Sequence, residues 1–209
     1  MKLYSSSQAP SARRVTMYLA EKGITVDTVE IDVMGGEQLG DDYRRINPDC
    51  MVPCLALDDG EVISESMAIC RYFEALHPEP PLFGTNPRDI ASIEMWGRFC
   101  EINGFLAVGD FLRNSFKPFA GRGLPGPVDC EQIPALAERA RLRYAYFLER
   151  INERLAGRDW LATDSFSNAD ITGFIAVDAG NMFKLPLDPA YTDLQRWYAA
   201  CGERPSAKG

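Results

Sequence analysis

Hydrophobic and polar positions follow two different periods in the first third of the chain. Residues 2–4 are a short run typical of a strand, and residues 25–31 alternate between apolar and polar side chains. Between these runs, apolar side chains in residues 12–19 recur at helical spacing, and Gly23 stands where a helix would end. The pattern predicts a strand, a helix and a second strand.

The stretch that follows predicts a helix, a hairpin and another helix. Residues 41–46 suit a short helix that ends before Asn47-Pro48. Residues 54–57 and 61–63 are apolar strands joined by an Asp-Asp-Gly turn, and residues 65–76 return to helical spacing. Strands separated by a helix pair in parallel, and hairpin strands pair antiparallel. We therefore expect one small mixed sheet.

A proline-rich segment changes the pattern for the rest of the chain. Residues 78–84 hold four prolines and glycines in seven positions, and no helix continues through such a segment. Beyond it, helical spacing recurs in residues 89–113 and 133–155, from Ser167 onward, and from about residue 190 to 201. The strand period does not return.

These periods predict two domains. The first is an α/β domain over residues 1–77, with the element order βαβ-αββα. A linker over residues 78–88 leads to an all-helical domain over residues 89–209. A chain of 209 residues is long enough to give two small domains a buried core.

The start of the third long helix carries a local folding signal. Ser167 and Asp170 have the spacing of a capping box, with Asp in place of the more common Glu. Phe166 and Ile171 occupy the two positions of a hydrophobic staple. A cap of this kind contributes about 1 kcal/mol. We interpret the motif as a device for folding and not as a catalytic site.

Charge and hydropathy limit the partners of the chain. The net charge is −8, and no basic run exceeds two residues. Binding to a phosphate backbone depends on clustered Lys and Arg, so we do not expect a nucleic-acid partner. No apolar run approaches the eighteen or so residues that span a bilayer, and no apolar leader follows Met1. We expect a cytoplasmic protein without a membrane partner.

The cysteines give no sign of a metal site. Six cysteines are scattered along the chain without a C-x-x-C pair, and His77 is the single histidine. Cys50 and Cys54 are four positions apart, but no second pair completes a zinc set. We therefore expect reduced, mostly buried thiols and no metal cofactor.

Two short motifs surround the predicted hairpin. Val52-Pro53 leads into its first strand, and Glu65-Ser66 opens the helix that follows its second strand. The Ser66 N–H and hydroxyl at a helix N-terminus suit a carboxylate, and the Glu65 carboxylate can accept hydrogen bonds from an ammonium group. The pair therefore suits a small charged peptide. Plain helix capping is the other interpretation.

In this order and spacing the motifs resemble those of the cytosolic glutathione transferases, along most of the chain. Val52-Pro53 is similar to the cis-proline step of that family, Glu65-Ser66 to its acid–serine pair, and residues 166–171 to its capping box. The resemblance implies a thioredoxin-like N-terminal domain, an all-α C-terminal domain and a homodimer. It also implies glutathione as co-substrate and a small hydrophobic electrophile as second substrate.

The resemblance implies a set of glutathione-binding residues. A cis bond before Pro53 would turn the Val52 N–H and C=O toward the cysteinyl backbone of glutathione. Glu65 would accept from the ammonium group, and Ser66 would bind a carboxylate. Gln38 lies near the position at which relatives place a His or Lys for the glycyl carboxylate.

Two positions depart from the family pattern. Ala9 stands where several classes carry a catalytic serine or cysteine, and Met51 where relatives commonly have Lys, Arg or Gln. The candidate hydroxyls that could stabilise the thiolate are Ser11, at the start of the first helix, and then Ser7, in the loop before it. A polar loop with helix capping is the other interpretation of these serines.

The electrophile pocket is expected between the two domains. Its candidates are Trp96, Phe99, Phe111 and Arg113, with Phe116 and Phe119 after them. Packing between helices or across a dimer interface is the other interpretation of these side chains.

We expect an enzyme, a glutathione transferase that stabilises the thiolate by hydrogen bonding and adds it to a small electrophile or reduces a peroxide. The alternatives are a non-catalytic glutathione-binding or regulatory relative and a glutathione-dependent disulfide reductase. Ala9 and Met51 favour the non-catalytic relative, whereas the intact Val52-Pro53 and Glu65-Ser66 motifs favour retained binding.

Overall fold

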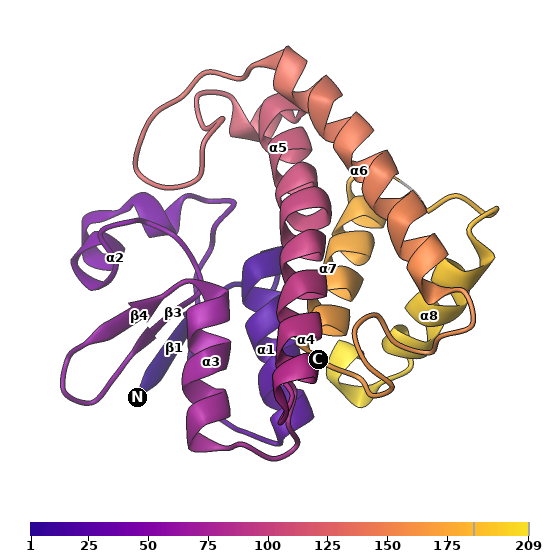
Figure 1. Ribbon diagram of the computed structural model, residues 1–209. Helices are drawn as coiled ribbons and strands as arrows, with labels where there is room; N and C mark the ends of the chain where they lie inside the picture. Colours follow the sequence, from indigo (N-terminus) through magenta and orange to yellow (C-terminus); the bar gives the residue numbers. More distant parts are fainter. Residues whose placement is uncertain (186, 209) are drawn as a thin grey trace.

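The computed structural model describes residues 1–185 and 187–208. Its N-terminal domain is a mixed sheet with helices, and its C-terminal domain is helical (Figure 1). This arrangement confirms the expected fold class. Residues 77–86, between the last helix of the first domain and the first helix of the second, form no helix or strand. The domain limits at 77 and 89 stay a prediction.

The N-terminal sheet has four strands in the order β2-β1-β3-β4. β1 pairs in parallel with β2 and antiparallel with β3, and β3 pairs antiparallel with β4, as the strand and hairpin patterns predict. Leu3 and Leu55 face each other in this register and are fully buried, so the sheet has an apolar centre. The strands are β1 (Lys2–Ser5), β2 (Asp27–Glu30), β3 (Cys54–Ala56) and β4 (Val62–Ser64).

The helices of this domain begin and end close to the residues that the sequence indicates. The first long helix ends at Gly23, which adopts the left-handed conformation with φ of 65°. That conformation is costly for residues with a side chain, and the Ile24 N–H closes the end on the Leu19 carbonyl at 2.9 Å. The helices and turns are α1 (Pro10–Lys22), η1 (Glu37–Leu39), α2 (Asp41–Ile46) and α3 (Ser66–Leu76).

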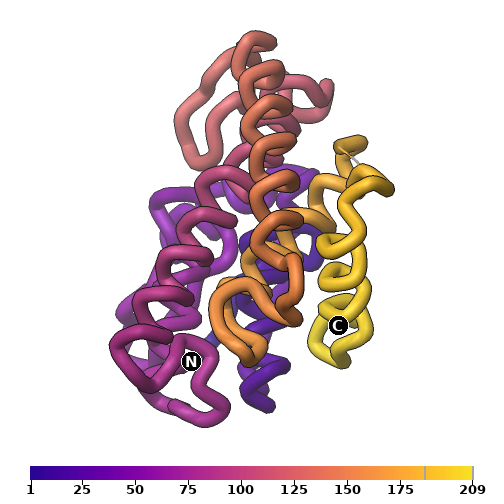
Figure 2. Tube along the Cα trace, turned by 45° about the vertical axis from the view of Figure 1, so that its right-hand side comes forward, coloured from indigo at the N-terminus to yellow at the C-terminus, as the bar shows by residue number. Residues whose placement is uncertain are grey.

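The C-terminal domain is built around α7. This helix is buried over most of its length and contacts α1, α4 and α8. α6 packs against α5 and against α8 (Figure 2). None of the described helices is both long and apolar enough to cross a bilayer. The elements are α4 (Pro87–Cys100), η2 (Glu101–Phe105), α5 (Leu106–Ser115), η3 (Lys117–Phe119), α6 (Pro134–Leu155), α7 (Asn168–Met182), α8 (Thr192–Gly202) and η4 (Pro205–Lys208).

A π-helical turn, η2, joins α4 to α5. The sequence predicts a single helix over residues 89–113, and Figure 1 shows α4 and α5 as one continuous rod. The turn η2 lies inside that rod. In a π-helical turn the backbone hydrogen bonds join residues five apart, where an α-helix joins residues four apart. Gly104 in this turn lies against the Phe147 ring of α6, where a Cβ would come within 2.6 Å of the ring. A side chain at this position would push α6 away.

A buried carboxylate holds the start of α7. The Ser167 N–H and hydroxyl each donate to Asp170 Oδ2 at 3.0 Å, so the expected capping box is present. On the other oxygen, Asp170 Oδ1 accepts from the Leu161 N–H at 2.8 Å and from Trp197 Nε1 at 2.9 Å. Burial raises the pKa of Asp170, although the hydrogen bonds oppose the shift. The capping carboxylate therefore also fastens α8 and the loop before α7.

We expect Asp170→Ala to lower the free energy of unfolding by about 3 kcal/mol or more. The change leaves the N–H groups of Leu161, Ser167 and Trp197 buried without an acceptor, at a cost of about 1–3 kcal/mol each. Urea denaturation measures the loss. The control is Asp164→Ala, because Asp164 is exposed and should change stability by less than about 0.5 kcal/mol. A loss below about 1 kcal/mol for Asp170→Ala would contradict the role given to this carboxylate.

Candidate active site

A cavity of about 270 Å³ lies between the two domains. One wall comes from the start of α1, from η1 and from residues 50–52, and the other from α5 and the segment after it. Most of the lining is apolar, which is usual for a small-molecule site. Of the side chains that the sequence analysis proposes, the lining includes Ser11, Gln38, Val52, Arg113, Phe116 and Phe119.

The turn before β3 is held by hydrogen bonds to its backbone. The expected cis peptide bond joins Val52 to Pro53. The Tyr43 hydroxyl donates to the Met51 carbonyl at 2.6 Å, and Asn47 Nδ2 donates to the same oxygen at 2.8 Å. Burial raises the pKa of Tyr43, so its hydroxyl stays protonated and remains a donor. Both donors are buried, and the turn is therefore fixed before any ligand arrives.

Ser11 lies at the point where α1 meets this turn. Its hydroxyl donates to the Val52 carbonyl at 2.9 Å. A carbonyl oxygen has two lone pairs, so Val52 can still accept a second hydrogen bond from a ligand. Among the described residues the Ser11 N–H has no acceptor, as is usual in the first turn of a helix. The cavity therefore ends on the positive end of α1.

Ser7 is placed differently from Ser11. Its N–H and its hydroxyl donate to Glu30 Oε1 at 2.7 and 2.8 Å, and it is not part of the cavity lining. The carboxylate of Glu30 draws the Ser7 hydroxyl toward the end of β2. Of the two candidate hydroxyls, the geometry favours Ser11.

Glu65 and Ser66 follow directly on the sheet. Cys54, the first residue of β3, pairs with Ser64, the last residue of β4. Pro53 and Glu65 therefore lie next to each other at the same end of the hairpin. Glu65 has a positive φ of 68°, which is uncommon for a residue with a side chain and is frequent at functional sites. It is exposed, and among the described residues no cation pairs with it. Its carboxylate is available to a ligand.

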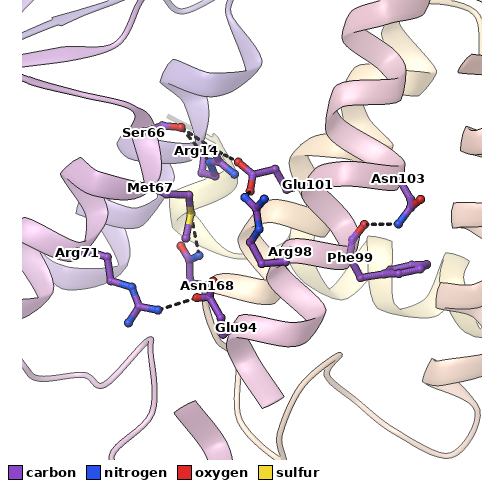
Figure 3. A network of polar contacts seen from close by, with 10 residues as sticks. All are labelled: Arg14, Ser66, Met67, Arg71, Glu94, Arg98, Phe99, Glu101, Asn103 and Asn168. Atoms are coloured by element: carbon purple, nitrogen blue, oxygen red, sulfur yellow. Dashed lines mark hydrogen bonds and ion pairs between the residues drawn. The ribbon is translucent and has the colours of Figure 1, made fainter. Parts of the chain in front are cut away.

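The Ser66 hydroxyl accepts hydrogen bonds from a buried arginine, whose role the sequence analysis missed. Arg14 Nη2 and Nε donate to the Ser66 hydroxyl at 2.5 and 3.2 Å, and Nη2 lies 3.3 Å from Glu101 Oε1 (Figure 3). Arg14 is 2% exposed, and its Nη1 has no partner. The Ser66 oxygen accepts from the cation, so the hydroxyl proton can go to a ligand carboxylate. The sequence signal for this role was the presence of a charged residue, Arg14, within the helical run of residues 12–19.

The large aromatic candidates of the long helix do not line the cavity. Trp96 packs edge-on against Phe99, with ring centroids 5.5 Å apart, and Phe99 stacks on Phe147 of α6 at 6.3 Å. Phe111 is buried and packs edge-on against Phe116 at 6.0 Å. These three candidates are therefore corrected from pocket residues to packing between helices.

The π turn bears on the third of these candidates, Phe111, because Trp96 and Phe99 precede it. One extra residue in a helix rotates the residues that follow by about 100°. The helical spacing of residues 89–100 therefore does not predict which residues of α5 share a face with them. From the last residue of the turn onward, the cavity is lined by Phe105, Val108 and Leu112, at positions i, i+3 and i+7.

Most of the thiols are buried in the packing of the two domains, and Cys50 is part of the cavity lining. Five of the six cysteines are buried, and Cys130 is partly exposed. Burial raises the pKa of Cys70 to about 12, and it also raises the pKa of Cys54 and of Cys201. Among the described residues, no group of three or more His, Cys, Asp or Glu side chains could hold a metal ion.

The folded protein should therefore react slowly with thiol reagents. We expect a chromogenic disulfide reagent at mildly alkaline pH to modify one thiol per chain rapidly, because Cys130 is partly exposed and the other five thiols are buried. Unfolding in urea should release all six thiols. Cys130→Ser should remove the rapid phase and leave the others unchanged. Rapid modification of several thiols in the native protein would contradict this prediction.

Comparison with known proteins agrees with the two-domain arrangement. The model of the glutathione S-transferase N-terminal domain matches residues 9–76, and that of the C-terminal domain matches residues 116–205. Glutathione S-transferase Z1 of Arabidopsis thaliana is 39% identical over 211 residues, which cover 99% of this chain and 89% of that protein. Glutathione S-transferase 2 of Saccharomyces cerevisiae is 30% identical over 210 residues, or 100% of this chain and 88% of that protein.

A solved structure shows the same fold over the whole chain. The crystal structure of a glutathione S-transferase domain-containing protein from Marinobacter aquaeolei VT8 superposes with a TM-score of 0.90 at 33% sequence identity. The match covers 99% of this chain and 100% of that chain. The relatives therefore span both domains and the cavity between them.

Proposed function

Because the chain belongs to the glutathione S-transferase family, we propose that it binds glutathione beside the Val52–Pro53 turn and transfers its thiolate to a second small molecule in the cavity. The observation that carries the proposal is the hydrogen bond from the buried Arg14 cation to the Ser66 hydroxyl. The neighbouring carboxylate of Glu65 forms no ion pair with another described residue. One end of glutathione carries a carboxylate and an ammonium group. The two side chains supply a donor to the first and an acceptor to the second.

The rest of glutathione would extend along the turn before β3. The Val52 N–H and C=O would pair with the cysteinyl backbone as a neighbouring strand does. Gln38 would bind the glycyl carboxylate. It is 4% exposed and lines the cavity, and its Oε1 has no hydrogen-bond partner among the residues that the structure describes. Since the two ends of an amide are interchangeable in assignment, its Nε2 can serve as the donor.

The cysteinyl sulfur would then lie at the start of α1. Ala9 there offers no hydroxyl or thiol, so stabilisation of the thiolate falls to Ser11 and to the free N–H groups of the helix end. The Ser11 proton, which goes to the neutral Val52 carbonyl in this structure, would turn to the thiolate, because a charged acceptor forms the stronger hydrogen bond. The N–H groups of the helix end are already in place, and they lower the barrier because they need no reorganisation when the thiolate attacks. This mechanism needs no covalent intermediate with an enzyme cysteine. A small electrophile would form a bond to the sulfur and expel a leaving group such as chloride. A hydroperoxide would break at its O–O bond and release an alcohol, and the oxidised sulfur would then form a disulfide with a second glutathione and release water.

We also propose that the protein is a cytoplasmic homodimer. Met95 on α4, and Leu142 and Tyr146 on α6, are about half exposed or more, and such side chains support a contact with a second copy. For the alternative of a non-catalytic relative, Ala9 and Met51 are the supporting observations. Activity measurements on Ser11 variants distinguish the two.

The first test concerns binding. We expect Glu65→Gln to raise the Kd for glutathione at least about tenfold, because a charge-assisted hydrogen bond is worth about 1.5–3 kcal/mol. Calorimetry measures the change, with Glu61→Gln in the exposed hairpin turn as the matched control. Glutathione that lacks its amino group should bind the variant and the original protein equally. The absence of binding heat at millimolar glutathione would refute the proposed function.

The second test concerns the thiolate. Ser11→Ala should lower kcat by about 10²-fold, the usual effect of removing one preorganised donor, with a chloronitrobenzene and with a hydroperoxide. It should also raise the pKa of bound glutathione, which the ultraviolet absorbance of the thiolate reports. Ser7→Ala should stay within about twofold, because its hydroxyl is held by Glu30. Unchanged rates in Ser11→Ala would assign the thiolate to the backbone of α1.

A further inference from the structure

The charged side chains that line the cavity are positive, although the chain as a whole is acidic. Among the described residues its lining includes two charged side chains, Arg113 on α5 and Arg122 after η3, and no carboxylate. The chain as a whole carries a net charge of −8, so acidic neighbours are abundant elsewhere. Arg113 and Arg122 belong to no ion pair among the described residues. Two cations therefore face the cavity without a counter-ion.

Both guanidinium groups lie against the same aromatic ring. Arg113 Cζ is 5.1 Å and Arg122 Cζ 5.5 Å from the centroid of Phe119. Burial lowers the pKa of Arg113, and the charge of Arg122 lowers it further. The two cations therefore repel each other, and an anion bound near both would offset that repulsion.

Backbone carbonyls hold both side chains in place. Arg113 Nη1 donates to the carbonyls of Arg122 and Leu124, each at 3.1 Å, and Arg122 Nη2 donates to the Val33 carbonyl at 3.2 Å. These acceptors are neutral and use only part of the five donors of each guanidinium. The remaining N–H groups are available, and the side chains need little ordering to bind a ligand.

Holding the loop after α5 does not require positive charge. Gln132 does the same with a neutral amide, whose Nε2 donates to the carbonyls of Arg113 and Phe116 at 2.7 and 2.8 Å. Two partly buried charges beside an apolar cavity cost free energy that a second glutamine would not. Ligand recognition accounts for the charge, and loop packing alone does not.

On these grounds we propose that Arg113 and Arg122 bind a carboxylate of the second substrate, so that the protein prefers electrophiles with an acidic group on an apolar body. The inference rests on the proposed function and narrows its substrate class. A guanidinium matches a carboxylate with two parallel hydrogen bonds. Both arginines belong to the helical wall, whereas Gln38 and Met51 on the opposite wall are neutral.

The glycyl group of glutathione is the other carboxylate within the site, and the experiment separates the two sources. The probes are a chloronitrobenzoate and its neutral carboxamide, together with the glutathione conjugates of both. We expect kcat/KM to be at least about tenfold higher for the acid, and calorimetry to show the acid conjugate binding at least about tenfold tighter than the amide conjugate.

Variants of the two arginines test whether these side chains cause the preference for the acid. Arg122→Gln should reduce kcat/KM for the acid about tenfold or more, leave the amide within about threefold and leave KM for glutathione unchanged. Arg122→Lys should fall between the two, because it keeps the charge and loses the fork. Arg113→Gln should act in the same direction. Arg139→Gln, on the exposed side of α6, is the matched control.

Three results would overturn the inference. Equal binding of the two conjugates by the original protein would show that the arginines do not recognise the acid group. A rise in KM for glutathione with both electrophiles, after Arg122→Gln, would assign the arginine to the glycyl carboxylate instead. In the third result, glutathione binds normally and neither conjugate binds. That result would show that the cavity does not bind the second substrate, and it would leave the proposed glutathione site unaffected.

Discussion

A buried guanidinium joins the two domains at the proposed glutathione site. Arg14 extends from α1 to the Ser66 hydroxyl at the start of α3 and to the Glu101 carboxylate in η2 (Figure 3). With 2% exposure the cation has lost its water, so it depends on these partners. The ring of Phe105, 4.9 Å from its Cζ, covers one face. The N-terminal domain, the helical domain and the ligand carboxylate therefore share one centre of positive charge.

This arrangement links binding to chemistry through a single helix. Arg14 lies one turn beyond Ser11 on α1, and Ser11 in turn holds the Val52 carbonyl. A displacement of α1 would change the support of Ser66, the position of the Val52 backbone and the distance from the helix end to the sulfur together. Most of the polar groups of the proposed glutathione site are therefore held by one another within the protein. Such preorganisation is what thiolate stabilisation requires in a protein that lacks a catalytic side chain at Ala9.

Much of the fold and part of the site follow from the sequence, because they depend on local patterns. The strand and helix periods and the Ser167–Asp170 cap need only near neighbours, and the resemblance supplied the Val52–Pro53 turn. The phase of the helix beyond Glu101 was missed, because a π turn depends on how Gly104 meets Phe147 from a distant helix. The missed turn affects the expected direction of Phe111, which follows it on α5. Arg122 could not be found either, since its position follows from the loop after α5.

The distribution of charge adds a constraint on what enters the cavity. The protein is acidic overall, so its surface repels anions at long range, and screening by salt limits that repulsion to about 8–10 Å. Inside the cavity the sign reverses, because Arg113 and Arg122 have no acidic partner there and the surroundings are apolar. Charges in such surroundings interact more strongly than at the surface. If the two arginines bind the acid group as proposed, discrimination between an acidic and a neutral second substrate is made after entry, at contact distance in the cavity, and not by attraction from solution.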